Sequence, residues 1–173
     1  LLTIGKAIGG GVPVGAFGVT AELARRALAQ EGADYEDVGG VGGTLAGNAL
    51  SLAAVRATLG EVLTDEAFAR MTSLGERLAA GIGRAILDAG VPWHVTRLGC
   101  RAEYRFRREP PRNGGESAAA GDEELERFLH LHALNRGVLL TPFHNMALVC
   151  PATTEADVDR YAELLAGALE ELA

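Results

Sequence analysis

The sequence has little of several things, and each shortage excludes a class of protein. Only two of the 173 residues are cysteine, Cys100 and Cys150, and they form neither a disulfide framework nor a CxxC metal-binding pair. No apolar run approaches the roughly 20 residues of a membrane-spanning helix, and no charged-then-apolar leader opens the chain. The net charge of −7 argues against general nucleic-acid affinity. These shortages predict a cytoplasmic protein whose two cysteines are buried as small apolar residues.

Lysine is scarce as well. One of the 16 basic residues is lysine, Lys6, and the others are arginine. Glycine, by contrast, makes up 23 of the 173 residues, well above the usual share of about 7%. Twelve of these glycines lie in the first 47 residues, mostly in two clusters, Gly5 to Gly18 and Gly39 to Gly47. The hydrophobic fraction of 48% is high enough for a buried core, so disorder is not expected.

The hydrophobic pattern predicts strand–helix alternation followed by an α+β region. Expected strands cover residues 1–4, 14–19, 93–98, 101–107, 138–140 and 146–149, and expected helices cover residues 20–30, 48–59, 64–90, 122–135 and 154–172. The helix at 48–59 is apolar on most sides, which predicts burial. We interpret the long helix at 64–90 as a connection between two domains, and we therefore divide the chain into domains 1–63 and 64–173. Residues 109–121 are expected to form a mobile loop.

Lys6 follows the first expected strand and has apolar and glycine neighbours. A solvated surface lysine is the ordinary interpretation of any lysine. Apolar neighbours disfavour the charged ammonium, however, and so make the amine a nucleophile for a carbonyl group. Nearby glycines allow a flat ligand to approach the backbone closely. These residues alone leave both a surface lysine and a Schiff-base lysine open.

The second glycine cluster contains Gly43-Thr44-Leu-Ala-Gly47-Asn48 and leads into a helix. A hydroxyl and free backbone N–H groups at a helix N-terminus attract phosphate, although a cap with a tight turn explains the same residues. Neither cluster fits a known nucleotide motif. A phosphate loop needs Ser or Thr where Ala7 stands, and the GxGxxG spacing is absent from both clusters.

Together, the two segments resemble those of class III pyridoxal-phosphate-dependent aminotransferases. The run from Thr3 to Gly18, Thr-Ile-Gly-Lys-Ala-Ile-Gly-Gly-Gly-Val-Pro-Val-Gly-Ala-Phe-Gly, is similar to the family's cofactor-lysine segment, closest to the glutamate-1-semialdehyde aminomutase-like branch. The Gly-Thr segment and the small-residue helix after it occur in the family's order and spacing. The resemblance implies an α/β protein of PLP-dependent transferase fold type I. Residues 1–63 would end its large cofactor-binding domain, and residues 64–173 would form the connecting helix and the small C-terminal domain.

The resemblance also implies roles for individual residues. Lys6 would form the internal aldimine with pyridoxal 5'-phosphate and move a proton between the substrate's α-carbon and the cofactor. Gly43 and Thr44 would bind the cofactor phosphate in the partner subunit's site, within a homodimer that shares its active sites. Arg97 lies about where some relatives bind a substrate carboxylate, a task that suits an arginine fork. His144 could line the substrate entrance. An arginine on a solvated sheet face and a plain turn histidine remain the alternatives.

No metal site is expected, because His130 and His132 are two residues apart on a helix and do not share a face. The arginines between positions 97 and 112 alternate with apolar residues, so a solvated sheet face is favoured over a nucleic-acid patch.

The family's other cofactor-binding residues belong upstream of Lys6, so the chain is expected to be a C-terminal fragment that is inactive by itself. The complete enzyme would transfer an amino group between a small amino donor and a keto or aldehyde acceptor. Two alternatives remain. One is a truncated, non-catalytic remnant that acts only in subunit association, and the other is a small acidic binding domain without a cofactor.

Overall fold

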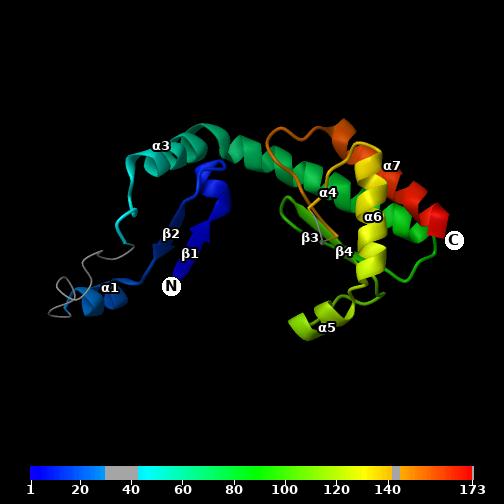
Figure 1. Cartoon of the computed structure of the whole chain (residues 1–173), viewed down its shortest axis with the longest axis horizontal. Helices are drawn as coiled ribbons and strands as arrows, with labels where there is room; N and C mark the ends of the chain where they lie inside the picture. The colour runs from blue at the N-terminus through cyan, green and yellow to red at the C-terminus, as the bar shows by residue number, and fades with distance from the viewer. Residues whose placement is uncertain (30–42, 142–144, 173) are drawn as a thin grey trace. The chain divides into compact units, whose positions relative to one another are not determined.

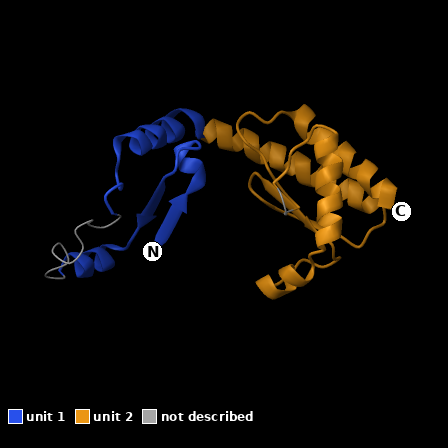
Figure 2. Cartoon of the chain, viewed as in Figure 1, with its two compact units in different colours: residues 1–64 blue, residues 65–173 orange. Residues whose placement is uncertain are grey.

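A computed structural model describes residues 1–29, 43–141 and 145–172. The chain forms two compact units, Leu1–Thr64 and Asp65–Ala173 (Figure 2), and each is treated separately below. Within the described residues, none of the helices combines the length and the hydrophobicity that crossing a membrane requires.

The described part of unit 1 contains a β-hairpin and four helical elements, of which Figure 1 labels α1 and α3. Strand β1 (Leu2–Gly5) pairs antiparallel with β2 (Gly15–Gly18), and the 3-10 helix η1 (Lys6–Gly9) begins the connection between them. Helix α1 (Ala21–Leu28) starts where the sequence predicts a helix, and Thr20 caps it, since its hydroxyl accepts the Leu23 N–H at 3.2 Å. Helix α3 (Ala49–Ala57) continues into a π-helical turn, η2 (Thr58–Val62).

Unit 2 combines a small sheet with helices. The antiparallel sheet has the order β3 (His94–Leu98), β4 (Arg101–Arg105) and β5 (Met146–Leu148). The long helix α4 (Asp65–Asp88) packs against α7 (Glu155–Leu172) and against β3 and β4, while α6 (Glu123–Asn135) packs against α7. A short helix, α5 (Gly114–Ala119), precedes α6.

The hydrophobic core of unit 2 lies between α4, α7 and the sheet. Apolar residues recur every three or four positions along α4, which places one stripe of the helix against its neighbours. Burial of each large apolar side chain contributes about 1.5–3 kcal/mol. The large buried side chains are Met71, Leu74, Leu78, Ile82, Ile86, Tyr104, Leu129, Val149, Val158, Tyr161, Leu165 and Leu169. Unit 2 therefore has a core of its own.

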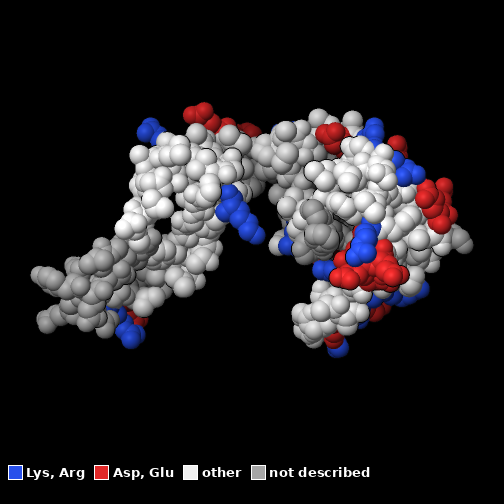
Figure 3. Space-filling model, in the orientation of Figure 1, with Lys and Arg blue, Asp and Glu red and all other residues white. Residues whose placement is uncertain are grey.

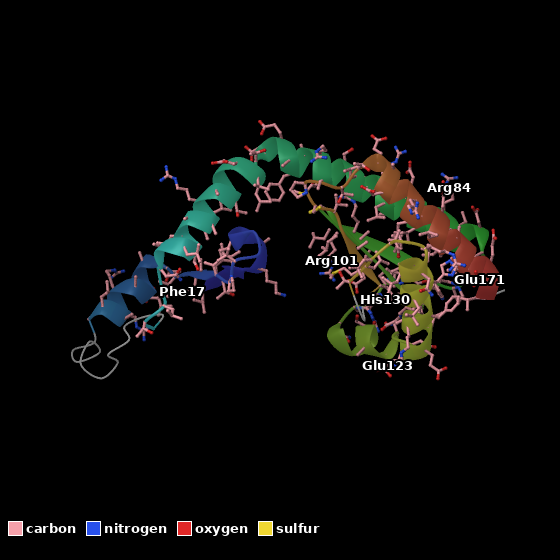
Figure 4. All side chains as sticks on the ribbon, turned by 45° about the horizontal axis from the view of Figure 1, so that its top comes forward. Phe17, Arg84, Arg101, Glu123, His130 and Glu171 are labelled. Atoms are coloured by element: carbon pink, nitrogen blue, oxygen red, sulfur yellow. The ribbon has the colours of Figure 1, made fainter. Side chains whose placement is uncertain are left out.

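The sheet of unit 2 carries an ion-pair cluster around a buried carboxylate. Ala102 and Tyr104 on β4 are buried, as the alternating pattern predicts. Glu103 lies on the same side of the strand as the arginines, which the pattern places toward solvent, yet it is only 9% exposed. Its carboxylate forms salt bridges with the guanidinium groups of Arg101 and Arg105 (Arg101 is labelled in Figure 4). The arginine-rich strand thus neutralises a carboxylate within its own sheet.

Two predictions of local structure are wrong. Residues 138–140 form no strand. The predicted loop at 109–121 contains α5, because the Asn113 side chain accepts the Glu116 N–H at 2.9 Å and so caps a helical turn. A Gly- and Ala-rich composition indicated a loop, but a single N-cap residue outweighs that tendency here.

Two predictions of burial are also wrong. Within α3 only Ser51 is buried, whereas Leu50 is 71% exposed and Leu52 54% exposed. An apolar helix needs partners on several sides, and the described part of unit 1 covers only one of them. On the face shown in Figure 3, charged side chains are sparse over unit 1, whereas acidic and basic residues are interspersed over unit 2.

The two cysteines are not buried as predicted. Cys100 is half-buried and Cys150 is exposed. The Thr153 hydroxyl lowers the pKa of the Cys150 thiol by donating to Sγ.

Glycines in α4 allow a matched test of this packing. A Cβ at Gly75 would lie 2.6 Å from the Gly99 carbonyl oxygen, whereas a Cβ at Gly83 would make an ordinary 3.5 Å contact with Val95. We expect Gly75→Ala to lower the free energy of unfolding by about 1–3 kcal/mol through overpacking. Gly83→Ala should raise it by about 0.5–1 kcal/mol through helix propensity. Urea denaturation followed by circular dichroism measures both, and equal effects of the two changes would contradict the predicted close approach.

Candidate functional site

Lys6 is the first residue of η1 and has an unusual backbone conformation. Its φ is +52°, and among the described residues no other non-glycine residue has a positive φ. The left-handed region costs an L-residue roughly 1–2 kcal/mol. The surrounding structure must therefore hold Lys6 in place, and strain of this kind concentrates at functional sites.

Loop 6–14 is closed from within unit 1. The antiparallel pair Gly5–Gly15 fixes both ends of the loop. Inside it, Gly9 is buried, and a Cβ at this position would lie 2.4 Å from Cγ1 of Val14. Only glycine lets η1 pack this closely against the Val14 side chain.

Helix α3 and its continuation hold the same loop from outside. The Ser51 hydroxyl donates to the Pro13 carbonyl at 3.1 Å. Oγ1 of Thr58 lies 2.7 Å from the place that a Cβ on Gly10 would occupy, and Gly10 has a φ of +57°. The sequence interpretation missed Ser51 and Thr58. Their signal is a pair of hydroxyl residues seven positions apart, on one face of an otherwise apolar helix.

The Lys6 side chain is exposed, and no described residue forms a hydrogen bond or an ion pair with it. The expected apolar enclosure is therefore wrong for this chain, because the glycines near Lys6 have no side chains with which to cover it. The amine is left free of internal partners and is accessible to a ligand.

The Gly-Thr segment forms a turn just before α3. Gly43 and Gly47 both have positive φ values, +75° and +67°. Between them Thr44 is exposed, and neither its hydroxyl nor its N–H has a partner among the described residues. Asn48 caps α3, since its Oδ1 accepts the Ser51 N–H at 2.9 Å. Thr44 thus presents two free donors close to a helix N-terminus, an arrangement that suits a phosphate group.

A chain of hydrogen bonds connects this turn with the lysine loop, although Lys6 and Thr44 do not contact each other among the described interactions. The Asn48 amide donates to the Leu45 carbonyl at 3.0 Å and to the Ser51 hydroxyl at 3.1 Å. The Ser51 hydroxyl donates in turn to the Pro13 carbonyl. Both predicted cofactor segments are therefore fixed to the first turns of α3.

The remaining candidate residues lie elsewhere. Arg97, on β3 of unit 2, donates to the Gly99 carbonyl at 3.0 Å and forms a salt bridge of 3.1 Å with Glu76 on α4. His144 lies outside the described residues. In the described ranges, no group of three His, Cys, Asp or Glu side chains is arranged to hold a metal ion. A cavity of about 410 Å³ in unit 2, lined in part by Trp93, His94 and Arg108, contains none of the predicted site residues.

Sequence comparisons agree on one family. Residues 1–169 match the family model described as Aminotransferase class-III. The glutamate-1-semialdehyde 2,1-aminomutase of Anaeromyxobacter sp. is 34% identical over 174 residues, which cover 100% of this chain and 39% of the relative. The enzyme of the same name from Opitutus terrae is 38% identical, over 99% of this chain and 39% of the relative. The chain thus spans about two fifths of the length of the curated relatives that it matches.

Solved structures extend the comparison to a second activity. A glutamate-1-semialdehyde aminomutase from Pseudomonas aeruginosa PAO1 is 47% identical, with a TM-score of 0.91 over 99% of this chain and 39% of that chain. A variant of a Pseudomonas aeruginosa PAO1 aminomutase was solved in complex with PMP. A β-phenylalanine aminotransferase from Variovorax paradoxus is 31% identical, with a TM-score of 0.81 over 98% of this chain and 38% of that chain. An aminomutase and an aminotransferase therefore share the fold of this segment.

Substitution of Lys6 tests its left-handed backbone. We expect Lys6→Gly to be more stable than Lys6→Ala by about 1 kcal/mol, because only glycine adopts this conformation without a steric penalty. At positions with an ordinary backbone conformation, a glycine variant is normally less stable than the alanine variant. Urea denaturation of the two variants, in the longest form of the protein that folds, measures the difference. An alanine variant as stable as the glycine variant would show that this backbone conformation is not held.

Proposed function

The chain belongs to the class-III aminotransferase family, and on that premise we propose that it is part of a pyridoxal-phosphate-dependent aminotransferase or aminomutase in which Lys6 holds the cofactor. The observation that carries the proposal is the lysine itself. It is exposed, free of internal partners and held in a strained backbone, inside the segment that resembles the family's cofactor-lysine segment.

The fold predicted from the sequence, the α/β fold type I of PLP-dependent transferases, is confirmed by the family match and by the aminomutase and aminotransferase structures. Because the chain covers about two fifths of its relatives, the complete activity would need residues that the relatives have in addition. We therefore assign unit 1 to the end of the cofactor-binding domain and unit 2 to the small C-terminal domain.

Lys6 is the residue that would attach the cofactor's aldehyde carbon through Nζ. An arginine could not replace it, since the guanidinium is delocalised and stays protonated in proteins. Bound pyridoxal phosphate supplies an electron-withdrawing ring, which accepts the electron pair left when a proton leaves the substrate's α-carbon. Once the substrate's amino group has replaced Nζ at the aldehyde carbon, the released Lys6 Nζ would take up that proton and hold it close to the reacting carbons. Attachment of the cofactor and uptake of the proton both require a Lys6 amine that is not engaged by another side chain.

Thr44 would bind the cofactor phosphate with its hydroxyl and its N–H, helped by the positive end of the α3 dipole. Gly43 would support this role, since its positive φ shapes the turn. In the homodimer that we propose, the phosphate belongs to the partner subunit's cofactor. That assignment is compatible with the finding that no interaction joins Lys6 and Thr44 within the described part of the chain.

The substrates would be a small amino donor and a keto or aldehyde acceptor. Related proteins carry the names of both an aminomutase and a β-phenylalanine aminotransferase, so transfer between two molecules and transfer within one both remain candidates. Arg97 is a weaker candidate for a substrate carboxylate, because its guanidinium is already paired with Glu76.

Lysine labelling tests the central assignment. Pyridoxal phosphate is added to the full-length protein, borohydride reduces the adduct, and peptide mass spectrometry locates the pyridoxyl group. We expect the label on the Lys6 peptide. Lys6→Arg keeps the charge but should abolish the label and lower amino transfer by at least about 10²–10⁴-fold, the usual contribution of a positioned acid–base group. A label only on another lysine would refute the assignment. Labelling of Lys6 without transfer to any keto acid would favour the non-catalytic remnant.

Thr44→Ala should weaken cofactor binding about 10-fold or more, because hydrogen bonds to a charged group contribute about 1.5–3 kcal/mol. Thr44→Ser, which keeps the hydroxyl, serves as the control and should stay within about threefold of the wild type. Equilibrium dialysis of the full-length protein measures the dissociation constants. Equal affinities of the alanine and serine variants would exclude the threonine hydroxyl as a phosphate donor.

A hybrid dimer tests the exchange between subunits. When a Lys6→Arg subunit pairs with a Thr44→Ala subunit, one site combines an intact Lys6 with an intact Thr44 from the other chain. We expect this hybrid to regain tight cofactor binding at one of its two sites, although neither variant homodimer has a complete site. A hybrid with no restored site would show that Lys6 and Thr44 act on the same cofactor within one subunit.

A further inference from the structure

Loop 6–14 depends on few interactions outside itself. Its ends are fixed by the Gly5–Gly15 pair. Among the described residues, one side chain outside the loop forms a hydrogen bond with it, and that side chain is Ser51. The Ser51 hydroxyl donates to the Pro13 carbonyl across 38 positions of sequence, and the Ser51 side chain lies in one of the few buried positions of unit 1.

Ser51 is itself well oriented. Asn48 accepts the Ser51 N–H with Oδ1 at 2.9 Å and donates to the Ser51 hydroxyl from Nδ2 at 3.1 Å. The hydroxyl accepts one hydrogen bond and donates another, so its proton is directed at the Pro13 carbonyl. A buried hydroxyl with both functions satisfied restrains the groups that it joins.

The restraint acts on Lys6 through the backbone. Lys6 and Pro13 stand near opposite ends of one short loop, and Lys6 occupies a conformation that L-residues avoid. Removal of the Pro13 anchor would allow the loop to relax, and Lys6 could then move toward a less strained backbone conformation. A shift of Cα by a fraction of an ångström is amplified along the four-carbon side chain to Nζ, where small displacements affect catalysis strongly.

We infer that Ser51 is a positioning residue, whose hydrogen bond to Pro13 holds Lys6 Nζ at the cofactor. The inference rests on the proposed function of Lys6 and assigns a role to a residue whose described hydrogen bonds are with Asn48 and Pro13, not with Lys6. Ser51→Ala would preserve the helix and the lysine but would let Nζ move away from its bonding position.

The test compares Ser51→Ala with Thr20→Ala in the full-length protein loaded with pyridoxal phosphate. Each variant loses one hydroxyl hydrogen bond within unit 1, but Thr20 caps α1 and does not touch loop 6–14. Hydroxylamine competes with Lys6 for the cofactor, and loss of the visible absorbance band reports the rate. We expect Ser51→Ala to lose the cofactor about five- to tenfold faster than the wild type, Thr20→Ala to stay within twofold, and Ser51→Thr to return toward the wild-type rate.

Hydrogen exchange supplies a readout that does not depend on the cofactor. The amides of Gly10 and Val12 donate to the Ala7 and Gly9 carbonyls inside the loop. Ser51→Ala should speed their exchange by about five- to tenfold, while Thr20→Ala should leave it unchanged. A purely structural role would lower the melting temperature without a selective effect on the loop.

The possible failures are distinguishable. If borohydride does not label Lys6 in the wild type, the proposed function is wrong and the positioning role is wrong with it. If Lys6 is labelled normally, but Ser51→Ala and Thr20→Ala match in hydroxylamine rate and in loop exchange, only the positioning role is overturned.

Discussion

The left-handed backbone at Lys6 is the constraint on which the rest of unit 1 depends. The chain leaves β1 and enters β2 through a loop that starts in a strained conformation, so its other positions must compensate. A side chain at Gly9 would clash with Val14, and a side chain at Gly10 would clash with the Thr58 hydroxyl, so glycine is needed at both positions. The α3 helix adds the hydrogen bond from Ser51. The first glycine cluster and the buried face of α3 therefore serve a single local geometry.

Unit 2 is stabilised in a different way. Its core is complete within the described residues, with α4 and α7 in close contact. A Cβ at Gly81 would lie 2.8 Å from Cβ of Ala162, so glycine sets the approach of the two helices. Among the described residues, every buried hydrophobic side chain belongs to unit 2, whereas unit 1 leaves Leu50, Leu52 and Phe17 more than half exposed (Phe17 is labelled in Figure 4). A two-stranded hairpin is at best marginally stable by itself. The unit with the candidate site is thus the one that depends more on residues outside this chain.

The sequence predicted the helices with regular apolar spacing or a capping residue well. It predicted poorly the features that depend on contacts between distant parts of the chain. Regular apolar spacing identified α4, α6 and α7, and Thr20 marked the start of α1, because helix signals are local. The spacing of two motifs around Lys6 and Thr44 identified the family. The exposure of Lys6 could not be predicted, since it depends on which side chains fold over the loop. The strained φ of Lys6 and the hydrogen bond from Ser51 to Pro13 were likewise out of reach, because a contact over 38 positions leaves no periodic trace.

The division of basic residues between arginine and lysine follows from their chemistry. Several arginines of unit 2 form salt bridges with carboxylates, as at Arg77 with Asp159, Arg101 with Glu103 and Arg136 with Glu171. Arginine suits this task because its planar fork matches a carboxylate. Lys6 has no such partner among the described residues, and an amine, unlike a guanidinium, serves as a nucleophile for a carbonyl group. Among the 16 basic residues lysine stands only at position 6, the position to which we assign the attachment of the cofactor. The lone lysine is informative because of where it stands and what does not contact it, more than because of its rarity.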